Sequence, residues 1–219
     1  MSKSLSMKGW MLSLALTFGG VAHAGEVQVG RTGYSLQAEQ QGAGPVAVVF
    51  ESGFGQGAGV WKDVIANLDA ECQCIAYARA GLGKSGTDGK PKTIEQHVQD
   101  LAAVMDALAA DRKVVLVGHS YGGLLATEFA RMYPDRLQGL VLVDPATMKQ
   151  RHAFKQANRD RVLGDDKALL GMLPPNMAED YKLLIAQLDS EAAASPRELP
   201  DVPAALLTST QVAAEPFVF

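Results

Sequence analysis

Residues 114–123 of the chain are VVLVGHSYGG, an apolar run that leads directly into a Gly-x-Ser-x-Gly pentapeptide. The apolar residues predict a strand buried on both faces, and residues 121–132 are expected to form a helix that follows the serine. A serine at such a strand-to-helix turn is typical of a nucleophile elbow, which exposes the hydroxyl above a sheet. So tight a turn needs neighbours that are nearly free of side chain, and Gly118 and Gly122 meet that need. Ser120 is therefore the candidate nucleophile.

Short apolar runs alternate with longer helical patterns along the rest of the chain, which favours an α/β fold with a mostly parallel sheet and helices on both faces. Residues 26–41 alternate weakly and predict an antiparallel hairpin at a sheet edge. Thr93 and Gln96 form a capping box at the start of the most clearly periodic helix. Further strands are expected at residues 46–50, 72–77, 140–143 and 204–207, and a further helix at about 60–68.

Residues 147–200 depart from this alternation, with charged helical segments and several prolines. We expect them to form a helical lid, inserted after the sixth strand and covering the strand ends. The α/β core would then comprise residues 25–146 and 201–219.

The first residues have the pattern of an export signal. Two lysines precede an apolar run over residues 10–21, which ends at the small-residue triplet Ala22-His23-Ala24. The alternative is a membrane anchor, but the run is shorter than the ~20 apolar residues that a spanning helix needs. We therefore predict a signal peptide at residues 1–24, cleaved after Ala24. The mature protein is expected in the periplasm or outside the cell, with no stable membrane insertion.

The composition is that of one globular domain, with 219 residues of which 47% are hydrophobic and 20% charged. The formal net charge is -4, and charges of both signs are spread along the chain, so no basic face is available for a nucleic acid. The sequence contains no pattern of metal ligands and no phosphate-binding loop. We expect no cofactor and no metal, and a small-molecule substrate as the partner.

The elbow and two glycine-rich loops together resemble the α/β-hydrolase superfamily of the serine esterase and lipase type. The loop FESGFG at residues 50–55 lies where that family carries His-Gly-x, with Ser52 in place of the histidine. This correspondence implies an oxyanion hole formed by the backbone amides of Phe54 and Tyr121. The loop YARAGLGKS at residues 77–85 resembles the family's Asp-x-x-Gly-x-Gly-x-Ser, with Ala78 in place of the aspartate.

Glu51 precedes Ser52 and is expected to be buried, so it needs a partner of opposite charge. Arg79, in the second loop, is the candidate.

The resemblance implies the order nucleophile, acid, histidine along the chain. Asp144 closes the strand at 140–143 and occupies one of the two positions that the family uses for the acid. The other position follows residues 204–207, where the chain has Thr208, Ser209, Thr210 and, further on, Glu215. Since no aspartate follows that later strand, we favour Asp144 as the acid. The alternative is a structural aspartate that caps the turn before Pro145.

None of the four histidines has the position of the family's catalytic base, which follows an eighth strand. His23 lies in the predicted signal, His97 in a helix, and His119 directly before the nucleophile, where it should point away from the hydroxyl. His152 lies in the predicted lid. Three explanations remain: a truncated chain that lacks the last helix and the eighth strand, an inactive descendant, or a rebuilt site that recruits His152. We favour truncation.

These observations predict a serine hydrolase that cleaves a small or medium ester, amide or lactone through an acyl-enzyme on Ser120. Since the base is missing, we expect this chain by itself to be inactive. The alternative is a non-catalytic binding protein with an α/β-hydrolase fold that has lost its base.

Overall fold

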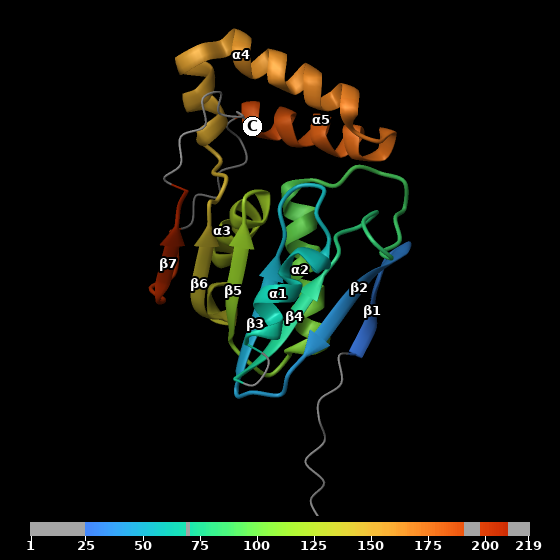
Figure 1. Ribbon diagram of the computed structural model, residues 1–219, viewed down its shortest axis with the longest axis vertical. Coiled ribbons are helices and arrows are strands. Elements are labelled where there is room, and N and C mark those ends of the chain that lie inside the picture. Colours follow the sequence, from blue (N-terminus) through green and yellow to red (C-terminus); the bar gives the residue numbers. More distant parts are fainter. Residues whose placement is uncertain (1–24, 69–70, 191–197, 210–219) are drawn as a thin grey trace, which may run out of the picture.

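The structure, a computed structural model, describes residues 25–68, 71–190 and 198–209 (Figure 1). It contains a seven-stranded sheet with the strand order β1-β2-β4-β3-β5-β6-β7. The strands are β1 Gly25–Arg31, β2 Tyr34–Gln41, β3 Val46–Glu51, β4 Cys72–Tyr77, β5 Val114–His119, β6 Leu137–Val143 and β7 Ala204–Leu207. The five strands β4, β3, β5, β6 and β7 pair in parallel with their neighbours. Strands β1 and β2 form an antiparallel hairpin at one edge, and β2 pairs antiparallel with β4. The predicted mostly parallel sheet with an edge hairpin is confirmed.

Helices cover both faces of this sheet, as Figure 1 shows, with α1 on one face and α2 and α3 on the other. The helices are α1 Lys62–Ala66, α2 Ile94–Leu108, α3 Tyr121–Met132, α4 Gln150–Met172 and α5 Pro175–Asp189. The helix expected at about 60–68 is shorter than predicted, because a 3-10 turn at Ala58–Trp61 precedes it. The capping box before α2 is confirmed: the amide of Gln96 donates to Oγ1 of Thr93 at 3.1 Å, and the amide of Thr93 donates to Oε1 of Gln96 at 2.9 Å.

The position of β5 in the middle of the sheet explains its continuous apolar sequence. Val114 and Leu116 are fully buried in the cluster that includes α2 and α3. Val117 points to the opposite face, where it packs in a second cluster with Trp61 and Ile65. Each fully buried side chain of this size contributes about 1.5–3 kcal/mol through the hydrophobic effect. A strand with helices on both faces therefore has no solvated side on which polar residues would be tolerated.

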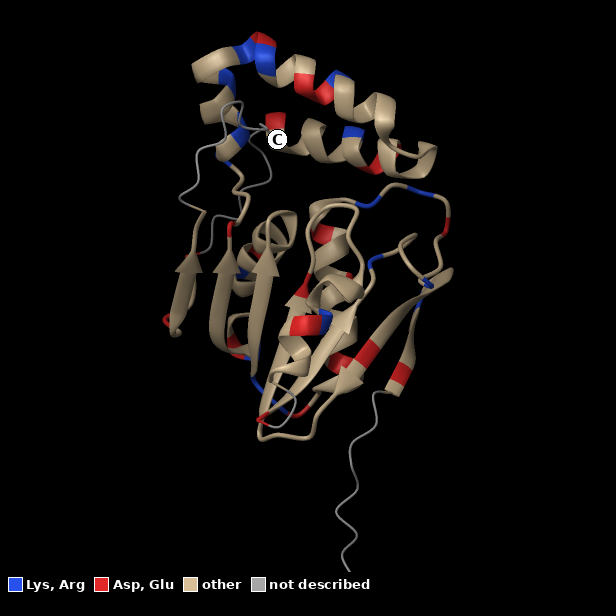
Figure 2. Cartoon of the chain, in the orientation of Figure 1, with Lys and Arg blue, Asp and Glu red and all other residues tan. Residues whose placement is uncertain are grey.

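Helices α4 and α5 lie beyond the carboxyl ends of the parallel strands (Figure 1). Figure 2 shows acidic and basic residues interspersed along α4, whereas β5 and β6 carry none. Arg151 of α4 is buried and binds Asp166 with both terminal nitrogens, at 2.9 and 2.6 Å. Its Nε donates to Asp189 of α5 at 2.9 Å, and the hydroxyl of Tyr181 donates to Asp166 at 2.8 Å. This buried network joins α4 to α5. The division of the chain into a core and an inserted lid stays a prediction.

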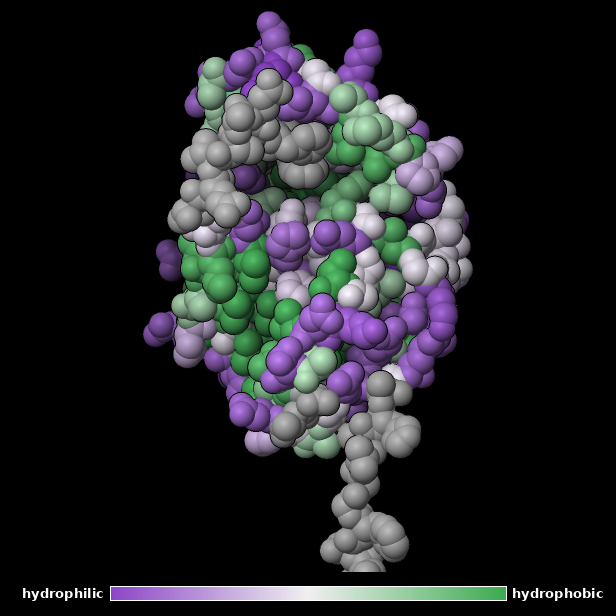
Figure 3. Space-filling model, in the orientation of Figure 1, coloured by the Kyte–Doolittle hydropathy of each residue, from purple (hydrophilic) through white to green (hydrophobic). Residues whose placement is uncertain are grey.

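The β7 edge of the sheet is apolar and accessible. Leu206 and Leu207 are 65% and 52% exposed. Figure 3 shows hydrophobic surface at this end of the sheet.

Several predictions concern residues outside the described ones. One is the signal peptide predicted at residues 1–24. Thr210 and Glu215, which follow β7 at the family's other position for the acid, also lie outside the described residues. Among the described residues, no helix has the length and apolar character that a bilayer span requires. The predicted location in the periplasm or outside the cell stays a prediction.

Candidate active site

Ser120 lies at the turn between β5 and α3 with a backbone conformation that L-residues rarely adopt, φ 52° and ψ -121°. A Cβ atom on Gly118 would lie 2.5 Å from the carbonyl oxygen of Gly122. A Cβ atom on Gly122 would lie 2.3 Å from the carbonyl oxygen of Glu51. Both distances are far below van der Waals contact. The prediction that this turn needs glycine on either side of the serine is confirmed.

The backbone of Ser120 is hydrogen-bonded to residues on both sides of Asp144. The amide of Ser120 donates to the carbonyl oxygen of Val143 at 3.1 Å, and the amide of Ala146 donates to the carbonyl oxygen of Ser120 at 2.9 Å. Asp144 itself has a positive φ of 45°. Its amide donates to the carbonyl oxygen of Leu207 at 2.7 Å. The elbow and the end of β6 are therefore held together, which brings the predicted acid to the site of the predicted nucleophile.

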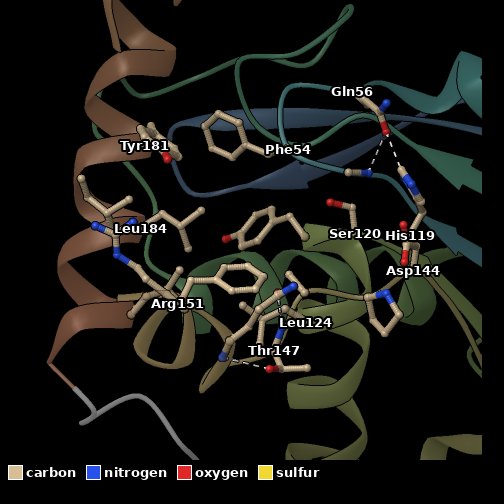
Figure 4. A pocket seen from close by; sticks show the side chains of 18 residues that line it. Phe54, Gln56, His119, Ser120, Leu124, Asp144, Thr147, Arg151, Tyr181 and Leu184 are labelled. Carbon is tan, nitrogen blue, oxygen red and sulfur yellow. Dashed lines mark hydrogen bonds between the residues drawn. The ribbon is translucent and has the colours of Figure 1, made fainter. Parts of the chain in front are cut away.

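A pocket of about 480 Å³ lies between the strand ends and the α4–α5 pair, and both Ser120 and Asp144 line it (Figure 4). Gln56 and His119 lie close to them, and Thr147 and Arg151 line the pocket away from these residues. Its apolar wall is formed by Phe54, Leu124, Phe154, Tyr181, Leu184, Ile185 and Leu188. The pocket thus combines a few polar groups with a mostly hydrophobic lining, as is typical of a binding site for a small molecule.

Phe54 and Tyr121, the predicted oxyanion-hole residues, line this pocket together with Ser120. Their rings meet edge to face, with centroids 5.9 Å apart. Within the described residues, neither backbone amide donates a hydrogen bond to a protein acceptor. The oxyanion hole formed by these two amides stays a prediction.

Gln56 fixes the loop before Phe54 and the histidine before Ser120 (Figure 4). Its Oε1 accepts a hydrogen bond from the amide of Gly53 at 3.1 Å and lies 3.3 Å from Nδ1 of His119. Because a carbonyl oxygen only accepts, this contact is a hydrogen bond in the tautomer of His119 that carries its proton on Nδ1. Nδ1 of His119 is thus directed at Gln56, and among the described residues no hydrogen bond joins His119 to the hydroxyl of Ser120.

Glu51, Tyr77 and Arg79 form a buried cluster beneath the loop at residues 52–54. The guanidinium of Arg79 and the hydroxyl of Tyr77 each donate a hydrogen bond to the Glu51 carboxylate. The predicted Glu51–Arg79 pair is confirmed. Burial raises the pKa of Glu51, and Arg79 and Tyr77 oppose this shift because both stabilise the charged carboxylate.

Ser52, at the position of the family's usual histidine, has a structural role. Its hydroxyl donates to the carbonyl oxygen of Gly57 at 3.1 Å and accepts from Nε1 of Trp61 at 3.0 Å. The loop therefore keeps its shape without the histidine.

The other two described histidines, His97 and His152, do not line the pocket. His97 is buried in α2, with its ring edge to face against Tyr121 at 5.9 Å. Burial, with smaller contributions from the positive charges of Arg79 and Lys92, lowers the pKa of His97 to about 3. His152 is exposed on α4, where Nε2 of its ring lies 2.9 Å from Nε2 of Gln156, and it does not line the pocket. Among the described residues, His119 is the only histidine that lines the pocket.

Sequence reasoning missed Gln56 and the wall that α5 contributes to the pocket. The spacing of Tyr181, Leu184 and Leu188 places all three on one face of a helix and could have indicated that wall. Gln56 stands in a glycine-rich loop, and no periodicity marks it.

The chain matches the model of the family described as alpha/beta hydrolase fold over residues 46–197. It is 35% identical over 107 residues to the protein YqjL of Bacillus subtilis (strain 168), a match that covers 49% of this chain and 42% of that protein. It is 31% identical over 114 residues to the (lyso)-N-acylphosphatidylethanolamine lipase of Homo sapiens, which covers 51% of this chain and 33% of the lipase. Among solved structures, E-2-(acetamidomethylene)succinate hydrolase superposes with a TM-score of 0.59 at 18% identity, over 85% of this chain and 91% of that one.

The matches cover less than half the length of the two sequence relatives. The structural likeness, at low identity, concerns the fold alone. The family model, however, matches most of the chain, including the elbow and the loops around Glu51 and Arg79. The chain belongs to the α/β-hydrolase family.

Proposed function

We propose that this hydrolase cleaves a small or medium ester, amide or lactone by acyl transfer to water, with Ser120 as the nucleophile. The observation that carries the proposal is the backbone of Ser120, held at φ 52° on the rim of a pocket lined by Phe54 and Tyr121. Backbone strain of this kind persists where it serves a site.

Each step assigns a role to a residue that lines the pocket. Ser120 Oγ attacks the carbonyl carbon of the substrate, and the amides of Phe54 and Tyr121 donate to the oxyanion that forms. Asp144 orients the base that takes the serine proton. Since no described histidine is hydrogen-bonded to the hydroxyl of Ser120, we expect the chain by itself to turn over at a rate close to background.

The pocket supports the proposed substrate class. A volume of about 480 Å³ with an apolar wall suits an acyl group of small or medium size. The relation to a lipase that acts on (lyso)-N-acylphosphatidylethanolamine supports an acyl substrate.

External imidazole provides the test, because a small base can occupy the place of a missing side chain. The rate of p-nitrophenyl butyrate hydrolysis is measured with and without imidazole, for the chain and for Ser120→Ala. Without imidazole we expect equal rates. With imidazole we expect the chain to exceed Ser120→Ala, because only the chain carries a hydroxyl that the base can activate. Equal rates at every imidazole concentration would contradict the proposal.

The lack of a histidine hydrogen-bonded to Ser120 among the described residues favours a second candidate, a binding protein that keeps the pocket and has no turnover. This candidate predicts saturable binding of the ester, measured by calorimetry, with the same affinity in Ser120→Ala as in the unchanged chain. It also predicts that imidazole produces no hydrolysis that depends on Ser120.

A further inference from the structure

The side chain of Arg79, which does not line the pocket, contacts three successive residues of the loop that carries the proposed oxyanion hole. Arg79, which is 3% exposed, follows β4 and points under this loop. Its Nη1 donates to the Glu51 carboxylate and, at 2.6 Å, to the carbonyl oxygen of Ser52. Its Nη2 donates to the carbonyl oxygen of Gly53. One guanidinium therefore holds three consecutive residues.

The contact with Gly53 determines where the next amide points. The carbonyl oxygen of Gly53 also accepts from the amide of Gln56 at 3.2 Å, so donors hold it from two sides. The peptide bonds of the described chain are not cis, and in a trans peptide the C=O and N–H groups point in opposite directions. With the Gly53 carbonyl directed at Arg79, the amide of Phe54 is directed away from Arg79.

The same guanidinium contacts the second proposed donor residue. Its central carbon lies 5.3 Å from the centroid of the Tyr121 ring, within the range of a cation–π contact. Arg79 thus touches the peptide that carries the Phe54 amide and the side chain of Tyr121.

A buried ion pair by itself is weak evidence for a role in stability, because desolvation of the two charges offsets much of their attraction. An arginine fork, however, binds several acceptors in a fixed plane, which a lysine does not. The Glu51 carboxylate holds that plane in turn, since it accepts from Arg79 and from the hydroxyl of Tyr77.

We propose that Arg79 is a positioning residue, which directs the backbone amide of Phe54 into the oxyanion hole through its hydrogen bond to the Gly53 carbonyl. This inference rests on the proposed function, since the oxyanion hole is part of that function. It adds a residue that acts through the backbone and does not itself touch the substrate.

Butylboronic acid provides a test that needs no catalytic base. Ser120 Oγ forms a bond to the trigonal boron, the hydroxyl proton leaves to solvent, and the boron becomes a tetrahedral anion that keeps both of its hydroxyl groups. Those boron-bound oxygens occupy the place of the oxyanion. Titration of the ¹⁵N-labelled chain reports the dissociation constant and the separate amide signals of Phe54 and Tyr121. Ser120→Ala, which cannot form the adduct, is the reference.

In the wild-type chain we expect Ser120-dependent shifts of both amide signals. In Arg79→Lys, which keeps the charge but loses the fork, we expect the Phe54 shift to disappear and the Tyr121 shift to remain. Affinity should fall about 10-fold or more, the usual effect of losing one hydrogen bond to an anion. Arg79→Met leaves Glu51 without its cation and is prone to unfolding, so E51Q/R79M serves as the neutral second variant with the same expected result.

Arg31→Met is the matched control, because it removes another ion pair, Arg31–Asp100 at 2.7 Å, that does not line the pocket. It should leave both shifts and the affinity unchanged. If Arg79→Lys and E51Q/R79M keep the Phe54 shift at wild-type affinity, the role of Arg79 is refuted while the proposed function stands. If the wild-type chain forms no Ser120-dependent adduct, the proposed function fails and the role of Arg79 fails with it.

Discussion

The amide of Ser120 donates a hydrogen bond to the carbonyl oxygen of Val143 at 3.1 Å, which ties the turn after β5 to the last residue of β6. The neighbouring Asp144 also has a positive φ, so two unfavourable backbone conformations lie next to each other. Such conformations persist only where surrounding contacts hold them in place. Here the contacts are the hydrogen bonds on either side of Asp144.

The strain at Ser120 predicts the order of stability of two variants that both remove the hydroxyl. Glycine adopts φ 52° without the steric cost that alanine incurs, although it gains more entropy in the unfolded chain. We expect Ser120→Gly to be more stable to urea unfolding than Ser120→Ala by about 1 kcal/mol. If alanine proves equal or better, the turn does not store strain at this residue.

The close approach at Gly122 predicts a destabilising substitution with a matched control. In Gly122→Ala the new methyl group would lie 2.3 Å from the Glu51 carbonyl oxygen, so the elbow or β3 must shift. We expect a loss of unfolding free energy of about 2 kcal/mol or more. Gly164→Ala, in α4, has no atom within 4 Å of the new Cβ and should be neutral or stabilising, because alanine favours helix. Comparable losses in both variants would show that the elbow is not tightly packed.

The elbow could be predicted from sequence because its requirements are local. A strand, a helix and two glycines within ten residues specify the turn at Ser120. The Glu51–Arg79 pair was predictable for a different reason: a glutamate next to a buried strand needs a cation, and Arg79 stands in the next loop. The hydrogen bonds from Arg79 to backbone carbonyls were not predictable, because they depend on how the two loops approach each other in space.

The pocket wall and the base were beyond sequence reasoning for other reasons. The packing of α5 over the strand ends depends on the buried network around Arg151, whose partners are 15 and 38 residues away in the chain. No periodicity shows such a network. For the base, sequence left His152 open, and the described structure places it on the exposed side of α4, outside the pocket lining.

The network around Arg151 predicts a local loss of stability in the α4–α5 pair. Asp166 accepts from both Arg151 and Tyr181, so Asp166→Asn leaves a buried guanidinium with Asp189 as its remaining partner. We expect a loss of about 2–3 kcal/mol in hydrogen-exchange protection of α5, with little change in the sheet. Glu179→Gln removes an exposed ion pair with Lys182 on the same helix and should change protection by less than about 0.5 kcal/mol. Equal effects of the two substitutions would contradict this role of Asp166.

The buried His97 predicts that the chain loses stability as the pH falls. Burial lowers its pKa from 6.5 to about 3, so below pH 6.5 the unfolded chain binds a proton that the folded chain does not. The contribution of neutral His97 to the free energy of unfolding is therefore fully present above pH 6.5 and is lost progressively as the pH falls to about 3. The decline between pH 7 and pH 5 should be about 2 kcal/mol. His97→Gln, which does not titrate, should lack this part of the decline in urea unfolding at the two pH values, whatever its stability at pH 7. An equal decline in both proteins would mean that His97 takes up its proton in the folded state, and hence that water reaches it between α2 and Tyr121.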